Sequence, residues 1–169
     1  HDRGKKVYLT ANIIPHNKDI DEFEAFVKKI RPLGFDAALI SDLGMFDIIH
    51  TLAPEIPVHV STQANNVNWR SALMWYKLGA KRVVLAREMS FDEIREIREK
   101  IPSDMEIEAF VHGAMCISYS GRCLLSNYLT NRDSNQGACS HPCRWNYSLV
   151  EEKRPGEYMD VFENERGTF

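Results

Sequence analysis

The chain has 169 residues, of which 44% are hydrophobic and 27% are charged. This is the composition of a globular domain, and it excludes a disordered, collagen-like or low-complexity chain. Lys plus Arg total 21 and Asp plus Glu total 24, so the net charge is −3, which excludes a strongly basic nucleic-acid coat but not a local basic patch.

Hydrophobic periodicity predicts strands and helices in strict alternation along the first two-thirds of the chain. The expected strands cover residues 7–11, 36–41, 57–62, 82–87 and 106–111. The expected helices begin at Asp19, Leu43, Val67 and Ser90. Asp19 with Glu22, and Ser90 with Glu93, have the spacing of a capping box, which marks a helix N-terminus.

Alternating strands and helices indicate parallel strands joined by helical crossovers. No G-x-G-x-x-G turn follows a strand, which argues against a dinucleotide-binding fold. Polar residues lie at or near the carboxyl ends of the expected strands, at the edge where a barrel has its active site: Asn12, Asp42, Gln63, Arg87 and His112. We therefore interpret residues 1–112 as a partial (β/α)8 TIM-like barrel with parallel strands. A small five-stranded α/β domain is the alternative.

A complete barrel takes about 250 residues, and the chain begins without Met. We therefore expect a fragment of a longer protein. Unpaired strand edges invite pairing with another copy, which predicts a homo-oligomer or a strand-exchanged dimer. There is no apolar run of ~20 residues and no secretory signal, so we expect a cytoplasmic protein without membrane contact.

Four side chains near the strand ends are candidate catalytic groups: Glu108, His112, Arg87 and His59. Glu108 belongs to the inward strand face, where it would contact the substrate or support the metal group, or form an internal ion pair with a residue such as Arg87. His59 shares a polar strand face with Ser61 and Gln63, so it would bind a ligand or be a buried, hydrogen-bonded core residue. His112 follows the last strand, where it would act as an acid or base or be an ordinary loop residue.

The four cysteines cluster in the second expected region, residues 113–169. They are Cys116, Cys123, Cys139 and Cys143, with spacings C-x6-C, x15 and C-x3-C. Four thiolates hold either a zinc ion or a 4Fe-4S cluster. The loose first pair favours the cluster over zinc, whose ligands usually form C-x2–4-C pairs; unrelated thiols or disulfides are the third possibility.

Several motifs around these cysteines carry a family resemblance. The motifs Glu108-Ala109-Phe110, Gly113-Ala114-Met115-Cys116 and Gly121-Arg122-Cys123, with the closing Ser126, resemble the signature of the U-thirty-two peptidase family. Residues 137–145 and 154–157 are similar to the branch of that family that hydroxylates tRNA. The resemblance runs from about Val7 to Phe169, and full-length members continue beyond both ends of this chain.

The resemblance implies a barrel-like domain whose four cysteines hold an iron–sulfur cluster. It also implies oxygen-independent hydroxylation of RNA, with a tRNA wobble uridine converted to 5-hydroxyuridine and prephenate as a possible hydroxyl donor. Gly113 and Gly121 would adopt positive φ and bring backbone amides to the cluster. Arg122 would offset its charge, or be a solvated side chain.

Two further interpretations remain open at this point. The family name suggests a collagenase-like peptidase, but neither an H-E-x-x-H nor a G-x-S-x-G motif is present. A structural zinc scaffold would explain the cysteines but not the polar strand ends. After the last cysteine, cations alternate with aromatic residues in a pattern that suits either single-stranded RNA or a charged surface segment: Arg144, Trp145, Tyr147, Lys153 and Arg154.

Overall fold

The computed structural model describes residues 1–113, 115–161, 163–164 and 167–168. Ala114 of the Gly113–Cys116 motif lies outside them, as do residues 162, 165–166 and 169 in the C-terminal tail. Within the described part of the chain, no helix is long and apolar enough to cross a membrane.

A five-stranded parallel sheet forms the centre of the fold, in the order β1-β2-β3-β4-β5. Its strands are β1 (Tyr8–Thr10), β2 (Ala37–Ile40), β3 (Val58–Val60), β4 (Arg82–Val84) and β5 (Glu106–Glu108). The crossover helices are α1 (Asn17–Ile30), α2 (Leu43–Leu52), α3 (Trp69–Leu78) and α4 (Phe91–Lys100). The predicted α/β alternation is confirmed, although most strands are shorter than expected. The strand order never reverses, which a doubly wound sheet would require.

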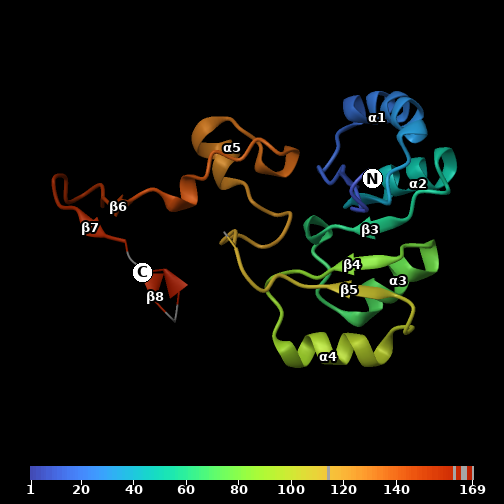
Figure 1. Ribbon diagram of the computed structural model, residues 1–169. Helices are drawn as coiled ribbons and strands as arrows, with labels where there is room; N and C mark the ends of the chain where they lie inside the picture. Colours follow the sequence, from blue (N-terminus) through green and yellow to red (C-terminus); the bar gives the residue numbers. More distant parts are fainter. Residues whose placement is uncertain (114, 162, 165–166, 169) are drawn as a thin grey trace.

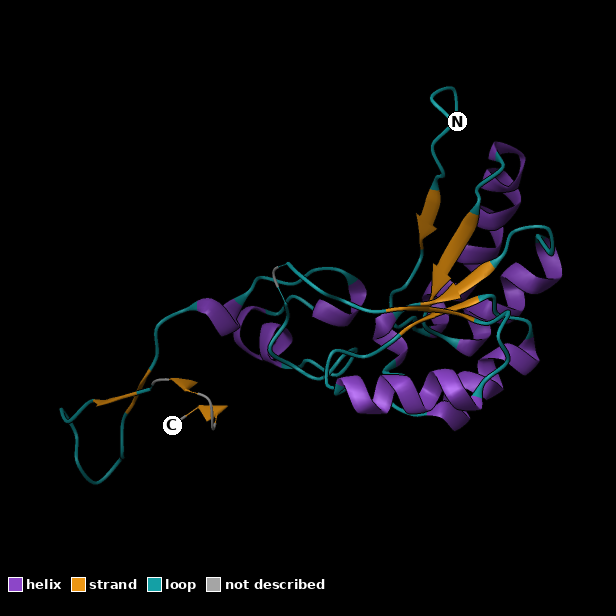
Figure 2. Cartoon of the chain, turned by 60° about the horizontal axis from the view of Figure 1, so that its bottom comes forward, coloured by secondary structure: helices purple, strands orange, loops and turns teal. Residues whose placement is uncertain are grey.

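The two faces of the sheet differ in polarity. Val58, Val60 and Val83 face the helices and belong to one continuous apolar core. The other face carries His59, Arg82 and Glu106 on neighbouring strands. This follows from the period of two along a strand, because residues paired across parallel strands point to the same side. The sheet is strongly twisted, and the crossover helices lie along its apolar face (Figures 1 and 2).

The helix N-termini confirm one predicted capping box and correct the other. Ser90 caps α4, and Glu93 accepts a hydrogen bond from the Ser90 backbone N–H at 2.7 Å. Asp19, in contrast, is the third residue of α1 and accepts from the backbone N–H of His16. Asp42, expected among the functional strand ends, caps α2 by accepting from the amides of Gly44 and Met45. Its role in this structure is therefore structural.

The segment after β5 lies beyond the carboxyl ends of the strands (Figure 1). It contains the short helix α5 (Leu125–Thr130) and two 3-10 turns, η3 (Ser134–Gln136) and η4 (Pro142–Arg144). A small hairpin follows, made of β6 (Ser148–Leu149) and β7 (Met159–Asp160). A last antiparallel pair of strands, β8 (Glu163–Asn164) and β9 (Gly167–Thr168), ends the described chain.

Candidate metal centre at the carboxyl edge of the sheet

All four cysteines line one cavity of about 210 Å³ in the segment after β5. Ile117, Leu124, Leu125 and Pro142 contribute apolar walls. The thiols are free, and three of the four are partly buried while Cys116 is exposed. Residues separated by up to 27 positions in the sequence thus face one small space, which is the arrangement expected of ligands to a shared group.

Ser120 fastens the loop between Cys116 and Cys123 to the sheet. Its side chain is fully buried, and its hydroxyl accepts hydrogen bonds from Thr62 and Arg87 at 3.2 Å each. The same hydroxyl lies 3.3 Å from a Glu88 carboxylate oxygen, which also accepts from the Ser120 backbone N–H at 2.8 Å. The loop is therefore held by residues that follow β3 and β4.

Gly121 brings the same loop into direct contact with the strand-end backbone. Its φ is +69°, and a Cβ atom at this position would lie 2.0 Å from the carbonyl oxygen of Gln63. Only glycine fits such an approach. The predicted positive φ is confirmed here and at Gly113, where φ is +136°; approach of their amides to a cluster stays a prediction.

A second set of hydrogen bonds connects α5 with the segment that carries Cys139. The hydroxyl of Ser126, a buried residue, accepts from the Ser140 backbone N–H at 3.0 Å and donates to the Arg132 carbonyl at 2.7 Å. Thr130 also contacts the Ser140 hydroxyl at 2.7 Å. These bonds fix the third cysteine relative to the helix that follows the second one.

Cys123 lies in surroundings that favour its thiolate. Burial raises the pKa of this thiol, but hydrogen bonds from the Ser134 and Ser118 hydroxyls and the amides of Leu125 and Ser126 outweigh burial and lower it. The thiolate is the form that binds metal. Among the described residues, no group of three or more His, Cys, Asp or Glu is placed to hold one metal ion.

A second cavity of about 220 Å³ lies between the cysteine segment and the strand ends. Cys116, Cys123 and Cys139 line it together with Arg87, so the two cavities share three thiols. Arg87 also donates to the Ser118 carbonyl at 3.4 Å. Of the four candidate catalytic residues, Arg87 is the one that the structure places on these cavities.

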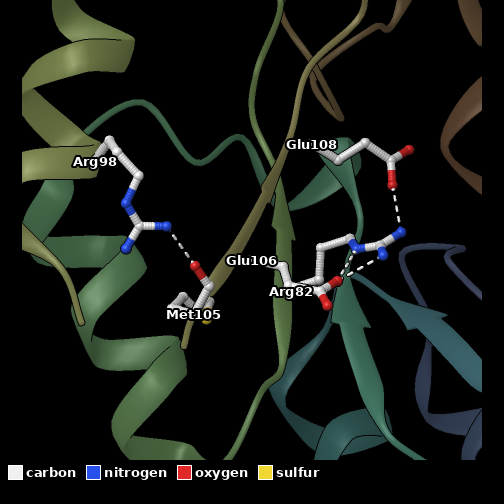
Figure 3. Close-up of polar contacts among 5 residues, drawn as sticks. All are labelled: Arg82, Arg98, Met105, Glu106 and Glu108. Carbon is white, nitrogen blue, oxygen red and sulfur yellow. Dashed lines mark hydrogen bonds and ion pairs between the residues drawn. The ribbon is translucent and has the colours of Figure 1, made fainter. Parts of the chain in front are cut away.

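Glu108 and His59 lie elsewhere on the polar face of the sheet. Glu108 accepts from Arg82 at 2.8 Å, and Glu106 accepts from the same guanidinium at 2.7 Å (Figure 3). The ion pair expected as one alternative for Glu108 is therefore present, but its partner is Arg82 and not Arg87. Arg82 is aligned in register with Glu106 on β5, whereas Arg87 follows the end of β4. Nearby, Arg98 of α4 donates to the Met105 carbonyl at 2.6 Å and ties the helix to the start of β5.

His59 is buried in a separate cavity of about 220 Å³ towards the amino ends of the strands. Its ring meets Tyr8 edge-on, with 5.1 Å between the ring centroids. The strand β3 ends at Val60, so His59 is the one member of the predicted polar stripe that lies in it. Ser61 caps the following 3-10 turn, Thr62–Ala64, and Gln63 lies within that turn. The predicted burial of His59 is confirmed. The predicted hydrogen bonding is not, because the ring has no hydrogen-bond partner among the described residues.

Replacement of His59 should change how stability depends on pH. Burial, followed by the positive charge of Arg82, lowers the pKa of His59 below the ordinary value of 6.5. The folded state thus prefers the neutral ring, and this stabilisation is complete above that value and is lost as the pH falls through the lowered pKa. We expect urea unfolding between about pH 7 and pH 5 to show a smaller loss of stability in His59→Met than in wild type. An unchanged slope in His59→Met would contradict this prediction.

The remaining predicted site residues lie at the surface. His112, Gly113 and Arg122 are exposed and line neither of the two cysteine cavities. Trp145 and Tyr147 are also exposed and stack on each other with 6.5 Å between ring centroids. Arg154 is paired with Glu151 at 3.2 Å, so that cation is partly neutralised.

Comparison with known proteins identifies the family. Residues 1–169 match the family described as Peptidase family U32. The chain belongs to this family. It is 41% identical to tRNA hydroxylation protein P of Escherichia coli (strain K12), over 100% of this chain and 46% of that protein. It is 46% identical to the protein of the same name from Haemophilus influenzae, over 89% of this chain and 33% of that protein.

This member of the U32 family thus spans less than half the length of these curated relatives. A solved structure described as the U32 peptidase Mk0906 superimposes with a TM-score of 0.54 at 18% identity. That similarity covers 64% of this chain and 46% of the other, and at this identity it concerns the fold alone.

Sequence reasoning missed several residues that build the U32 site. Ser120 directly precedes Gly121 in the family signature, and this adjacency was the available signal. Ser134 and Asn135 belong to a segment that carries no recognisable motif. Their positions depend on how the cysteine segment docks on the sheet, which periodicity does not encode.

Proposed function

We propose that the parent protein is an iron–sulfur-dependent RNA hydroxylase. One observation carries this proposal: four cysteines, spread from residue 116 to residue 143, line a single cavity at the carboxyl edge of the sheet. In α/β folds of this kind, that edge is where ligands bind. The names of the relatives support RNA as the substrate.

The cavity favours a 4Fe-4S cluster over zinc. One zinc ion needs its four ligands gathered tightly around a tetrahedron, whereas the described residues contain no such group around one ion. Four free thiols around a common apolar space suit a larger metal group, held by Cys116, Cys123, Cys139 and Cys143. Such a cluster supplies electron transfer when bound.

We infer that the reaction converts a tRNA wobble uridine to 5-hydroxyuridine without molecular oxygen. Replacement of the C5 hydrogen by a hydroxyl group is a two-electron oxidation, so the reaction needs a source of the hydroxyl group, for which prephenate is the predicted donor, and an external acceptor for two electrons. The protein's own contribution is to position the base. Arg87 lies beside three of the cysteines, where its charge attracts an anionic donor or the RNA backbone.

We also infer that the sheet is part of a (β/α)8 barrel. Within the described residues, β1 and β5 each pair with one strand only. Further strands of the longer protein would cover these edges, and in the isolated chain a second copy would take their place. The polar face around Arg82 and Glu106 would then line the barrel interior.

Metal analysis of the anaerobically purified full-length protein tests the proposal. We expect about four irons and four acid-labile sulfides per chain, both strongly reduced in Cys139→Ser. Tyr128→Ala is the control, since this exposed tyrosine on α5 lines neither cavity. Stoichiometric zinc, or no metal after reconstitution, would contradict the proposal.

Nucleoside analysis then tests the reaction itself. Cells that lack the protein should lose 5-hydroxyuridine from tRNA, and wild-type protein should restore it while Cys139→Ser does not. Gelatin cleavage that survives removal of iron but fails in Cys116→Ala would instead establish the collagenase-like peptidase.

A further inference from the structure

The cavity that Arg87 shares with three cysteines has the size of a site for one small planar group. Its volume of about 220 Å³ lies below the ~300–1,000 Å³ of sites for drug-sized ligands. Enzymes that modify a base place it in a pocket of this kind, out of the stack and between hydrogen-bonding and aromatic side chains.

Two side-chain amides of the lining have a fixed orientation. Gln63 donates through Nε2 to the carbonyl oxygen of Asn12 at 2.8 Å. Asn135 donates through Nδ2 to the carbonyl oxygen of Cys123, also at 2.8 Å. Backbone carbonyls only accept hydrogen bonds, so each amide nitrogen must face its carbonyl. The two amide oxygens remain as acceptors, and the structure gives neither a partner among the described residues.

An aromatic ring completes the lining. Tyr119 lines the cavity and is 64% exposed, so its ring makes few contacts with the rest of the protein. An exposed aromatic ring beside a pocket is a common stacking partner of a nucleobase in single-stranded RNA. A uracil ring offers the matching chemistry: a flat face for stacking and one N–H group, at N3, for an acceptor.

We propose that this cavity receives the target pyrimidine base of the RNA, with Tyr119 stacked on the ring and the Gln63 amide oxygen accepting the N3–H of uridine. This inference rests on the proposed function, because it assigns the substrate base of the same site. Asn135 keeps the loop before α5 in place through its bond to Cys123. The base is thereby held beside the thiols that line both cavities.

Binding of short single-stranded RNA to the full-length protein tests the stacking role. The probe is a fluorescent heptamer with one central uridine in an adenosine background, measured by anisotropy at fixed salt. Tyr119→Ala should weaken binding about tenfold, as loss of one stacked base does. Tyr128→Ala is the matched control, because that ring is 86% exposed on α5 and lines neither cavity. Equal affinities of the two variants would overturn the proposal.

An N3-methyluridine heptamer tests the hydrogen bond. In wild type, the methyl group should weaken binding about tenfold, because it removes the N–H that Gln63 accepts. In Gln63→Met the penalty should shrink to about twofold or less, because the acceptor is already absent. A full penalty in Gln63→Met, or none in wild type, would overturn the assignment. Circular dichroism should show that both variants stay folded.

These measurements separate the base site from the reaction. If uridine binding depends on Tyr119 and Gln63 but the protein forms no 5-hydroxyuridine, the base-site proposal stands and the hydroxylase proposal is contradicted. If neither substitution affects hydroxylation, the hydroxylase proposal stands and the base-site proposal is contradicted.

Discussion

Gly121→Ala should lower the free energy of unfolding by about 3 kcal/mol. Two costs combine: the positive φ of +69°, and a Cβ atom 2.0 Å from the Gln63 carbonyl oxygen. The first is worth about 1–2 kcal/mol and the second about 1–3 kcal/mol. The colliding atom belongs to the backbone, so the cysteine loop must move away from the sheet. Urea unfolding at neutral pH measures the loss.

Gly137→Ala is the matched control for this prediction. Its φ is +80°, but no atom lies within 4 Å of the position of an added Cβ. Only the cost of the backbone conformation applies, so we expect a loss of about 1 kcal/mol. Equal losses in the two variants would show that the close approach to Gln63 does not hold the loop in solution.

Ser120→Ala should lower the free energy of unfolding by about 2 kcal/mol. The substitution removes a buried hydroxyl that accepts from Thr62 and Arg87. Breaking one side of a buried hydrogen-bond network costs about 1–3 kcal/mol, because the partners stay desolvated. Arg87 would be the most affected, since its Nε is already buried without a partner among the described residues.

The control for this loss is Ser103→Ala, at an exposed turn position before β5. We expect a change within about 0.5 kcal/mol there. A hydrogen-exchange measurement adds a local readout: the Ser120 amide donates to Glu88 at 2.8 Å and should lose protection in Ser120→Ala. Unchanged stability and protection would mean that the loop is held by other contacts.

The sequence alone determined the alternation of elements and the identity of the cysteine ligand candidates. Apolar residues at helical spacing predicted α1, and its residues Phe23, Val27 and Ile30 are buried, the first two of them in the continuous core. The capping pattern of Ser90 and Glu93 predicted the start of α4. These are local signals, because a helix stripe or a cap involves residues within one or two turns of each other. The family signature likewise lies in contiguous motifs.

Only the tertiary structure decided which polar residues meet. Arg82, and not Arg87, pairs with Glu108, because strand register aligns β4 with β5. Asp42 caps a helix, and His59 lies in a cavity apart from the cysteines. Ser120, Gln63 and Asn135 gained their roles when the cysteine segment docked on the strand ends. Such contacts join residues tens of positions apart, and their geometry depends on the packing of the whole sheet, which no local pattern in the chain specifies.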